Sequence, residues 1–339
     1  MLQNSRGLVQ CCNGAALVIS RKNKLFISYD YGETWSFEIS IPIPSINQLK
    51  GMTVITSRLF RQKIDHVAWV DKDCMVVLGY GSIYSVDLNG SSVRSVAPVY
   101  GKRPLSLCDA PEGLYYGEYR DNSERSTIHV WGSSDKGVSW NPVWHFDSVR
   151  HVHGVFYDSY TDAIWVTTGD TDSESALWRT TDNFQSLECV LHGSQQYRAV
   201  QLLFSAEYVY WGSDTPLEKN YLYRFERTSG RVERIHAVEG SVFWGGEVNG
   251  RLFFSTAVEP SDVNNCNCSC VWGSQDGSAW TCVARFNKDR WPKKLFQYGQ
   301  TFFPSGHNDS DYLWITPFAT EQHETLQKMD VREIFNNAI

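Results

Sequence analysis

The stretch SYDYGETW, residues 28–35, follows the pattern S-x-D-x-G-x-x-W and decides how the rest of the chain is interpreted. SSDKGVSW, residues 133–140, repeats the pattern in full. SQDGSAW, residues 274–280, is one residue shorter, and TTDNFQSL, residues 180–187, is a degraded copy. Self-similarity at a regular spacing is typical of repeat architectures, so the chain is expected to consist of copies of one unit.

The spacing of these copies predicts the number of units. Their aspartates, at positions 30, 135, 182 and 276, are separated by close to one or two multiples of about 48 residues. Two further copies that have lost the turn motif are therefore expected. SIYSVDLNG (82–90) and YLYRFERTSG (221–230) lie at the positions that this spacing predicts. A seventh copy without the turn motif is YLWITP (312–317). Each unit also holds three further short apolar or alternating runs, which are typical of β-strands.

Seven units of four strands predict an all-β fold, a seven-bladed β-propeller with four-stranded blades. The innermost strands are expected at residues 8–12, 66–70, 105–109, 152–157, 199–204, 242–247 and 295–298. The seventh unit is expected to end in a strand at 326–331, which suits a helix equally well. No linker rich in Pro, Gly or Ser splits the chain, and 41–64 is the one long connection, so residues 1–339 are expected to form a single domain.

The repeated motif itself is interpreted as a structural turn. The aspartate accepts hydrogen bonds from backbone N–H groups, the glycine takes a positive φ, and the tryptophan packs under the sheet. The motif closes a hairpin between the third and fourth strands. It is therefore expected to mark one face of the propeller, while the loops of the opposite face carry the chemistry.

Composition and local motifs exclude several classes of function. A net charge of −7 argues against non-specific binding of nucleic acid. No uncharged stretch reaches the ~20 residues of a membrane span, and the segment 1–6 shows no secretory signal, so a cytoplasmic protein is expected. Nucleophile-elbow, metalloprotease and nucleotide-binding motifs are missing, and no cofactor is expected. Cys266, Cys268 and Cys270 form C-x-C-x-C without a second cluster, so reduced thiols are expected there instead of a metal site.

The four turn motifs resemble the Asp-boxes, or BNR repeats, of the sialidase-like β-propeller family. The resemblance covers essentially the whole chain through its repeats. It implies a carbohydrate-active protein, a glycoside hydrolase of sialidase-like type acting on an acidic sugar, with a six-bladed propeller as the alternative fold. Of the [FY]-R-I-P motif in sialidases, Arg6-Gly7-Leu8 keeps only the arginine.

The loops opposite the turn motifs collect polar residues from several blades. We expect His151, His153 and Asp170 to be catalytic, because an acid–base site needs imidazole or carboxylate groups held together. The residues expected to bind substrate are Gln196, Arg198, Asp214, Glu259, Gln297 and His307. The expected partner is a carbohydrate or glycoconjugate, which Arg198 would bind through an anionic group, with no nucleic acid and no membrane.

Two alternatives remain open at this point, and with them the question whether the protein is an enzyme. His151-x-His153 resembles the metal ligands of oligogalacturonate-lyase propellers, and with His307 or Gln196 the pair could hold Mn²⁺ or Zn²⁺ in a polysaccharide lyase. A non-catalytic propeller that binds a glycan or a protein would need the arginine and the aromatic surface but no paired carboxylates.

Overall fold

The computed structural model describes residues 6–259 and 261–335. Residues 1–5, which make up most of the segment where no secretory signal was found, lie outside the described residues, as do 260 and 336–339. The chain divides into two compact units. The first unit comprises Met1–Ile64, Pro216–Asn220 and Ile235–Ile339, and the second unit comprises Asp65–Thr215 and Tyr221–Arg234.

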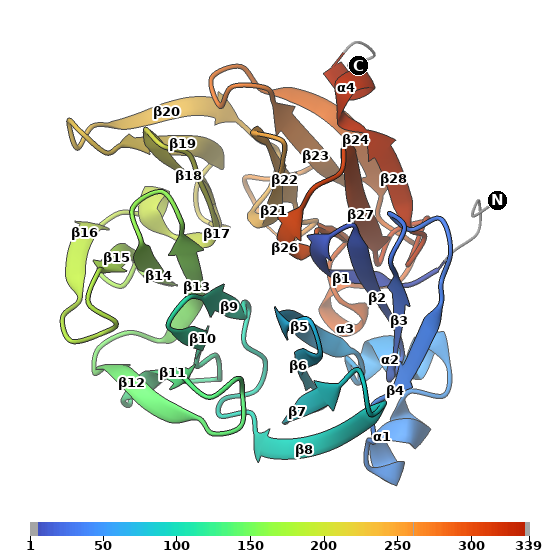
Figure 1. Cartoon of the computed structure of the whole chain (residues 1–339). Helices are drawn as coiled ribbons and strands as arrows, with labels where there is room; N and C mark the ends of the chain where they lie inside the picture. The colour runs from blue at the N-terminus through green and yellow to red at the C-terminus, as the bar shows by residue number, and fades with distance from the viewer. Residues whose placement is uncertain (1–5, 260, 336–339) are drawn as a thin grey trace. The chain divides into compact units, whose positions relative to one another are not determined.

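The fold is all-β, a seven-bladed β-propeller with four-stranded blades, as the repeat spacing predicts. The strands form seven sheets in the described part of the chain, and in most of them neighbouring strands follow one another in sequence (Figure 1). The expectation of a single domain over residues 1–339 stays a prediction.

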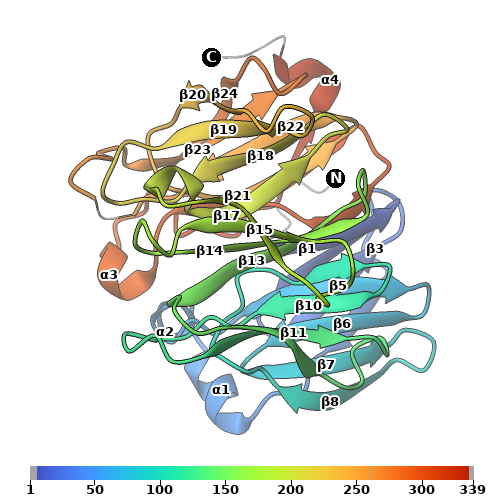
Figure 2. The same cartoon turned by 90° about the vertical axis from the view of Figure 1, so that its left-hand side faces the viewer.

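The second unit holds four sheets of four strands each (Figures 1 and 2). The first two consist of β5 (Ile64–Asp71), β6 (Cys74–Gly79), β7 (Ser82–Asp87) and β8 (Ser92–Pro98), and of β9 (Cys108–Ala110), β10 (Gly113–Gly117), β11 (Ile128–Ser133) and β12 (Asn141–Phe146). The other two consist of β13 (His151–Asp158), β14 (Ala163–Gly169), β15 (Ala176–Thr180) and β16 (Glu188–His192), and of β17 (Ala199–Phe204), β18 (Tyr208–Ser213), β19 (Tyr221–Glu226) and β20 (Val232–Ala237). A 3-10 turn, η1 (Gln195–Tyr197), precedes β17.

The first unit holds the other three sheets. One sheet consists of β26 (Ser305–Asn308), β1 (Leu8–Gly14), β2 (Ala16–Arg21), β3 (Lys24–Ser28) and β4 (Phe37–Ser40). A second sheet consists of β21 (Val242–Val248), β22 (Arg251–Thr256), β23 (Cys268–Ser274) and β24 (Thr281–Asn287). The third sheet consists of β25 (Gln300–Phe302), β27 (Tyr312–Phe318) and β28 (Gln327–Asp330). The described part of this unit also holds four short helices, α1 (Ser45–Lys50), α2 (Val54–Leu59), α3 (Lys293–Phe296) and α4 (Val331–Ile334). β26 pairs in parallel with β1, so the last repeat adds a strand to the first sheet.

The seventh repeat departs from the predicted pattern. The innermost strand expected at 295–298 is wrong, because α3 occupies its first half and Gln297 has a φ of 69°. The Phe296 carbonyl accepts hydrogen bonds from the Arg58 guanidinium of α2 and so is not available to a sheet. β25 takes the inner place instead and pairs with β27. The strand expected at 326–331 is confirmed as β28, which gives a sheet of three strands.

The turn motifs have the predicted geometry. In the first copy, Asp30 Oδ1 accepts a hydrogen bond from the Thr34 N–H at 2.8 Å, and Ser28 Oγ accepts one from the Gly32 N–H at 2.8 Å. Gly32 has a φ of 76°, the left-handed region that favours glycine. The hydroxyl of Thr34 is the main cause that lowers the pKa of Asp30 to about 2. The copies at 133–140 and 180–187 make the equivalent hydrogen bonds to their aspartates, and in the shorter copy at 274–280 the N–H groups of Ser278 and Ala279 both donate to Asp276.

Strand register separates the turn motifs from the opposite ends of the strands. Within the third sheet of the second unit, His151 at the start of β13 pairs with Gly169 at the end of β14. Thr180, where the turn motif begins, pairs with Ile164 at the other end of β14. The turn motif and the residue that follows β14, Asp170, therefore lie at opposite ends of this sheet, as predicted.

The core of the second unit lies between its sheets. Side chains of β10 and β11, such as Tyr115 and Val130, pack with Val155 of β13 and Val166 of β14 in one buried cluster. These close contacts hold the start of β13 next to the end of β10, so that residues from neighbouring blades meet at one edge.

Candidate functional site

The start of β13 presents two histidines to the same side. His151 and His153 are two residues apart, and His153 stands where the register shifts between Val152 and Gly154. The Nε2 atoms of both histidines nevertheless lie within 3.4 Å of the Asp170 carboxylate. Both residues are buried, and their rings lie 5.8 Å apart between centroids. Gly169 makes room for them, because a Cβ at that position would lie 2.7 Å from His153 Cε1 and 3.0 Å from Arg198 Cγ.

Asp170, the residue after β14, is the centre of the cluster. Its carboxylate lies 3.0 Å from Arg150, 3.1 Å from His151 Nε2, 3.3 Å from Arg198 and 3.4 Å from His153 Nε2. Burial alone would raise the pKa of Asp170, but the hydrogen bonds to the two histidines and the nearby positive charges outweigh it. They hold the pKa of this carboxyl far below its usual range, so Asp170 is an anion and does not donate a proton.

The hydrogen bonds of His151 constrain what lies between it and Asp170. Its Nδ1 is 2.9 Å from the carbonyl oxygen of Arg120, which only accepts, so Nδ1 carries a proton. Its Nε2 then faces the carboxylate of Asp170, which also only accepts. If the imidazole of His151 were neutral, with its one proton on Nδ1, the lone pair of Nε2 would face the negative carboxylate of Asp170. His151 therefore needs a second proton on Nε2, or a cation between Nε2 and Asp170.

Arg198 joins this cluster to a second carboxylate. It follows η1, at the start of β17, and Asp214 follows β18, so strand pairing brings the two together. Arg198 Nε lies 3.5 Å from Asp214 Oδ2, and the Arg198 carbonyl accepts a hydrogen bond from the Asp214 N–H at 2.8 Å. Asp214 Oδ1 is buried and accepts no hydrogen bond from the residues that the structure describes.

Three further residues of this cluster lie at the strand ends that the sequence points to, but they were not predicted to be site residues. Tyr119 stacks on His151 with ring centroids 4.3 Å apart, and burial raises the pKa of Tyr119 to about 12. Arg150 is the most exposed member, with 37% of its side chain accessible, against 17% for Asp170. Gln195 donates to the Asp170 carbonyl at 3.0 Å. Arg150 and Gln195 directly precede predicted site residues, and Tyr119 follows a strand end, so proximity along the chain was the available signal.

The remaining predicted residues have other surroundings. Gln196 contributes its backbone carbonyl, which accepts a hydrogen bond from the indole N–H of Trp211 at 2.7 Å. Glu259, Gln297 and His307 belong to the first unit. There, Glu259 accepts a hydrogen bond from Ser241 at 2.8 Å, Gln297 donates to the Arg58 carbonyl at 2.9 Å, and the exposed His307 lies 2.5 Å from Asp309. The structure brings together His151, His153, Asp170, Arg198 and Asp214.

His151, His153 and Asp170 also have the donor atoms of a metal site. One ligand atom from each lies within 4.8 Å of the others. Two imidazoles and a carboxylate suit first-row divalent ions. Metal-bound histidines usually donate their other ring N–H to a carbonyl or carboxylate, as His151 does to Arg120. The residues therefore fit a divalent ion, although Arg150 and Arg198 already neutralise much of the charge of Asp170.

Comparison with known proteins supports the fold. No family model and no curated protein matches the sequence. Among solved structures, a GH74 enzyme of Niastella koreensis matches with a TM-score of 0.62 at 12% identity, over 96% of this chain and 53% of that chain. The chain thus spans about half the length of that enzyme. An oligogalacturonate lyase of Vibrio parahaemolyticus matches with a TM-score of 0.60 at 8% identity, over 97% and 90%. A chain of the mitotic checkpoint complex matches with a TM-score of 0.58 at 12% identity, over 97% and 91%.

These neighbours include a glycoside hydrolase and a polysaccharide lyase, but at such low identity they establish the propeller fold alone. In the described part of the chain, no helix has the length and apolar character needed to cross a membrane.

Proposed function

We propose that the protein cleaves an acidic polysaccharide by β-elimination, at a divalent cation bound by His151, His153 and Asp170. The observation that carries the proposal is the position of His151, whose two ring nitrogens face the Arg120 carbonyl and the Asp170 carboxylate. A cation at Nε2 satisfies both partners without an extra proton on the ring.

The chain's own residues have distinct proposed roles. A bound divalent ion would draw electrons from the carboxylate of a uronic acid and so acidify the proton on the adjacent carbon. Arg150 and Arg198 bind that carboxylate, because a guanidinium offers a rigid fork of donors. Asp214, whose Oδ1 is free of hydrogen bonds from described residues, accepts the proton. The proton leaves, the C–O bond to the next sugar breaks, and the departing oxygen takes a proton from water.

A second function follows from a different observation. Arg150 and Arg198 lie 3.0 and 3.3 Å from Asp170, which lessens the attraction of this carboxylate for a metal. Without a metal, Nε2 of His151 would donate a hydrogen bond to Asp170 and would be the proton donor of the site. The cluster would then suit a glycoside hydrolase of sialidase-like type, with His151 as the acid and Arg198 bound to the acidic group of the sugar.

The family and the cellular location are also proposals. Hydrogen bonding in the four turn motifs supports membership of the Asp-box family. None of the nine cysteines, all of which the structure describes, forms a disulfide, which suits the reducing cytoplasm.

The test measures the cleavage of polygalacturonate, other polyuronates and sialylated glycans before and after metal removal. We expect chelation to abolish cleavage and added Mn²⁺ or Zn²⁺ to restore it. His153→Gln, which removes one donor atom, should lower turnover about 100-fold, in line with the loss of a metal ligand. The matched control is His145→Gln, because the His145 side chain is 64% exposed on β12 of the same unit. Cleavage that persists after exhaustive chelation would reject the metal and favour the hydrolase.

A further inference from the structure

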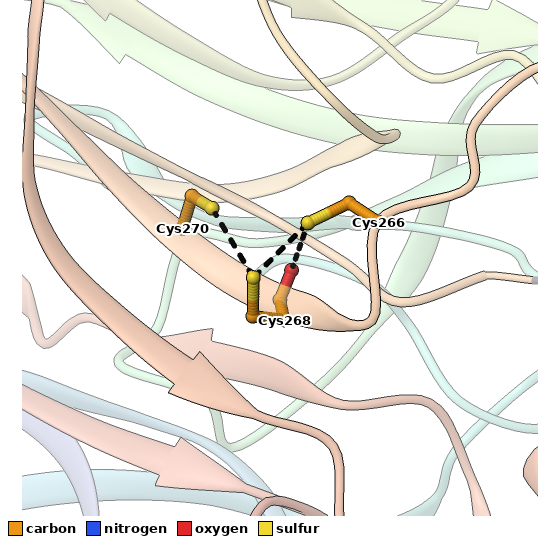
Figure 3. A group of neighbouring side chains, drawn as sticks. All are labelled: Cys266, Cys268 and Cys270. Carbon is orange, nitrogen blue, oxygen red and sulfur yellow. Dashed lines mark hydrogen bonds between the residues drawn. The ribbon is translucent and has the colours of Figure 1, made fainter.

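Three cysteine thiols converge at the start of β23 in the first unit. Figure 3 shows the sulfurs of Cys266, Cys268 and Cys270 turned toward one another, with Cys266 on the loop before the strand. The Sγ atoms of Cys266 and Cys268 are 3.0 Å apart, and those of Cys268 and Cys270 are 3.9 Å apart. All three lie within 4.8 Å of one another. The loop thiol is thus held against the strand by its neighbours.

Strand pairing adds a fourth cysteine that sequence spacing did not reveal. Cys268 and Cys270 project from the same face of β23, because they are two residues apart. The pairing of β23 with β24 shifts register between Val271 and Trp272 of β23, so that Trp272 pairs with Cys282. Directly paired residues share a face of the sheet, which places Cys282 on the face of Cys268 and Cys270. Its Sγ is not among the three thiol sulfurs that lie within 4.8 Å of one another, so Cys282 must move toward them to bind as a fourth ligand.

Burial and charge around the four thiols suit a bound cation. Cys270 and Cys282 are 0% and 4% exposed, whereas Cys266 and Cys268 are half-buried and form the accessible side. Arg285 Nε lies 3.3 Å from Cys282 Sγ and donates a hydrogen bond to it. Such a donor stabilises a thiolate and offsets part of the negative charge of a thiolate cluster.

We propose that Cys266, Cys268, Cys270 and Cys282 form a four-thiolate site for a single soft cation, with Zn²⁺ as the principal ligand. A tetrahedral zinc with bonds of ~2.3 Å places its sulfurs ~3.8 Å apart. The pair Cys268–Cys270 already has that separation, and the pair Cys266–Cys268 needs to open by less than ~1 Å. Each thiol that binds loses its proton. The site ties the loop that carries Cys266 and Glu259 to the strands β23 and β24.

This site is chemically separate from the cluster around Asp170. Sulfur ligands select Zn²⁺, Cd²⁺ and Cu⁺, whereas imidazole and carboxylate also accept Mn²⁺. A thiolate–metal charge-transfer band in the near ultraviolet reports sulfur ligation specifically, so the two sites can be measured independently in the same protein.

The experiment titrates the reduced, metal-free full chain with Cd²⁺ and Co²⁺ and records the thiolate–metal band. We expect one equivalent to saturate the band, with cobalt giving the intense visible bands of a tetrahedral site. Bound Zn²⁺ should protect the two accessible ligands, Cys266 and Cys268, from a thiol reagent that reacts with them in the metal-free protein. Cys270→Ser and Cys282→Ser should each raise the dissociation constant about 100-fold or more, since each removes a ligand.

The control is Cys189→Ser, because Cys189 is exposed on β16 of the second unit and should leave the band unchanged. If Cys270→Ser does not fold, the half-buried Cys268→Ser gives the same comparison. No thiolate–metal band, an unchanged affinity in Cys282→Ser, or a Cys266–Cys268 disulfide that forms in place of metal binding would each overturn the proposal.

Discussion

Replacing Asp170 by Asn tests whether this carboxylate holds its cluster together. The substitution keeps the shape but removes the only charge that Arg150, His151 and Arg198 share, at 3.0, 3.1 and 3.3 Å. Breaking a buried ion pair by removing one partner costs roughly 3–5 kcal/mol, because it leaves an uncompensated charge. Arg150 is 37% exposed and recovers some hydration, so we expect a loss near the lower limit, about 3 kcal/mol.

The assay is urea unfolding at pH 7 in the presence of a chelator, followed by tryptophan fluorescence and circular dichroism. The matched control is Asp121→Asn, which removes a carboxylate 3.4 Å from the same Arg150 but 73% exposed. Its free energy of unfolding should change by less than about 1 kcal/mol, as for other surface pairs. If Asp170→Asn is as stable as the wild type, or no less stable than Asp121→Asn, the reasoning about charge compensation is refuted.

Three further outcomes are expected. Gly137→Ala should lower the free energy of unfolding by about 2–4 kcal/mol, because φ is 82° and the new Cβ would lie 2.4 Å from Val76 Cγ2. The control Gly193→Ala, where φ is 92° and the new Cβ meets open space, should lower it by only about 1 kcal/mol in the same urea assay. Burial and the nearby Arg58 lower the pKa of His323 to about 4, so the folded state resists a proton that the unfolded chain accepts. Wild-type stability should therefore fall by up to ~1.4 kcal/mol per pH unit between about pH 6.5 and 4, and His323→Gln should flatten that slope in unfolding curves measured across this range. Arg198→Lys should raise the KM for acidic substrates about tenfold with a smaller change in kcat, since an ammonium point charge replaces the two-pronged guanidinium donor. Equal changes in KM and kcat for neutral and acidic sugars would contradict the binding of an acidic group by Arg198.

Much of the fold follows from the sequence because a propeller repeats one local arrangement. The spacing of Asp30, Asp135, Asp182 and Asp276 predicts the seven units, and alternating runs predict most inner strands. The seventh repeat was predicted less well, since α3 forms where a strand was expected. The carbonyl of Phe296, the last residue of α3, accepts a hydrogen bond from Arg58, which lies more than two hundred residues earlier in the chain. No local sequence pattern can predict such a distant contact.

The candidate site was predictable where strand ends determine it. The antiparallel pairing of β13 with β14 places His151 beside the residue after Gly169, whereas His153 stands at a register shift that simple alternation does not predict. The choice of Gln196 over Gln195 could not be made from sequence, because within the short turn η1 adjacent side chains point in different directions. Cys282 was missed for a similar reason, since a register shift in β24 decides which face it occupies.

The proposed function is tested most directly by the mass of the product released from a polyuronate by the metal-loaded protein. Elimination adds no water and leaves a carbon–carbon double bond, so each cleavage should give one fragment lighter by a water molecule than the hydrolysis product, with new absorbance in the ultraviolet. We predict this unsaturated product from the wild type and its loss in Asp170→Asn. A saturated product that has gained the elements of water, or binding of the polyuronate without any cleavage, would contradict a lyase at this site.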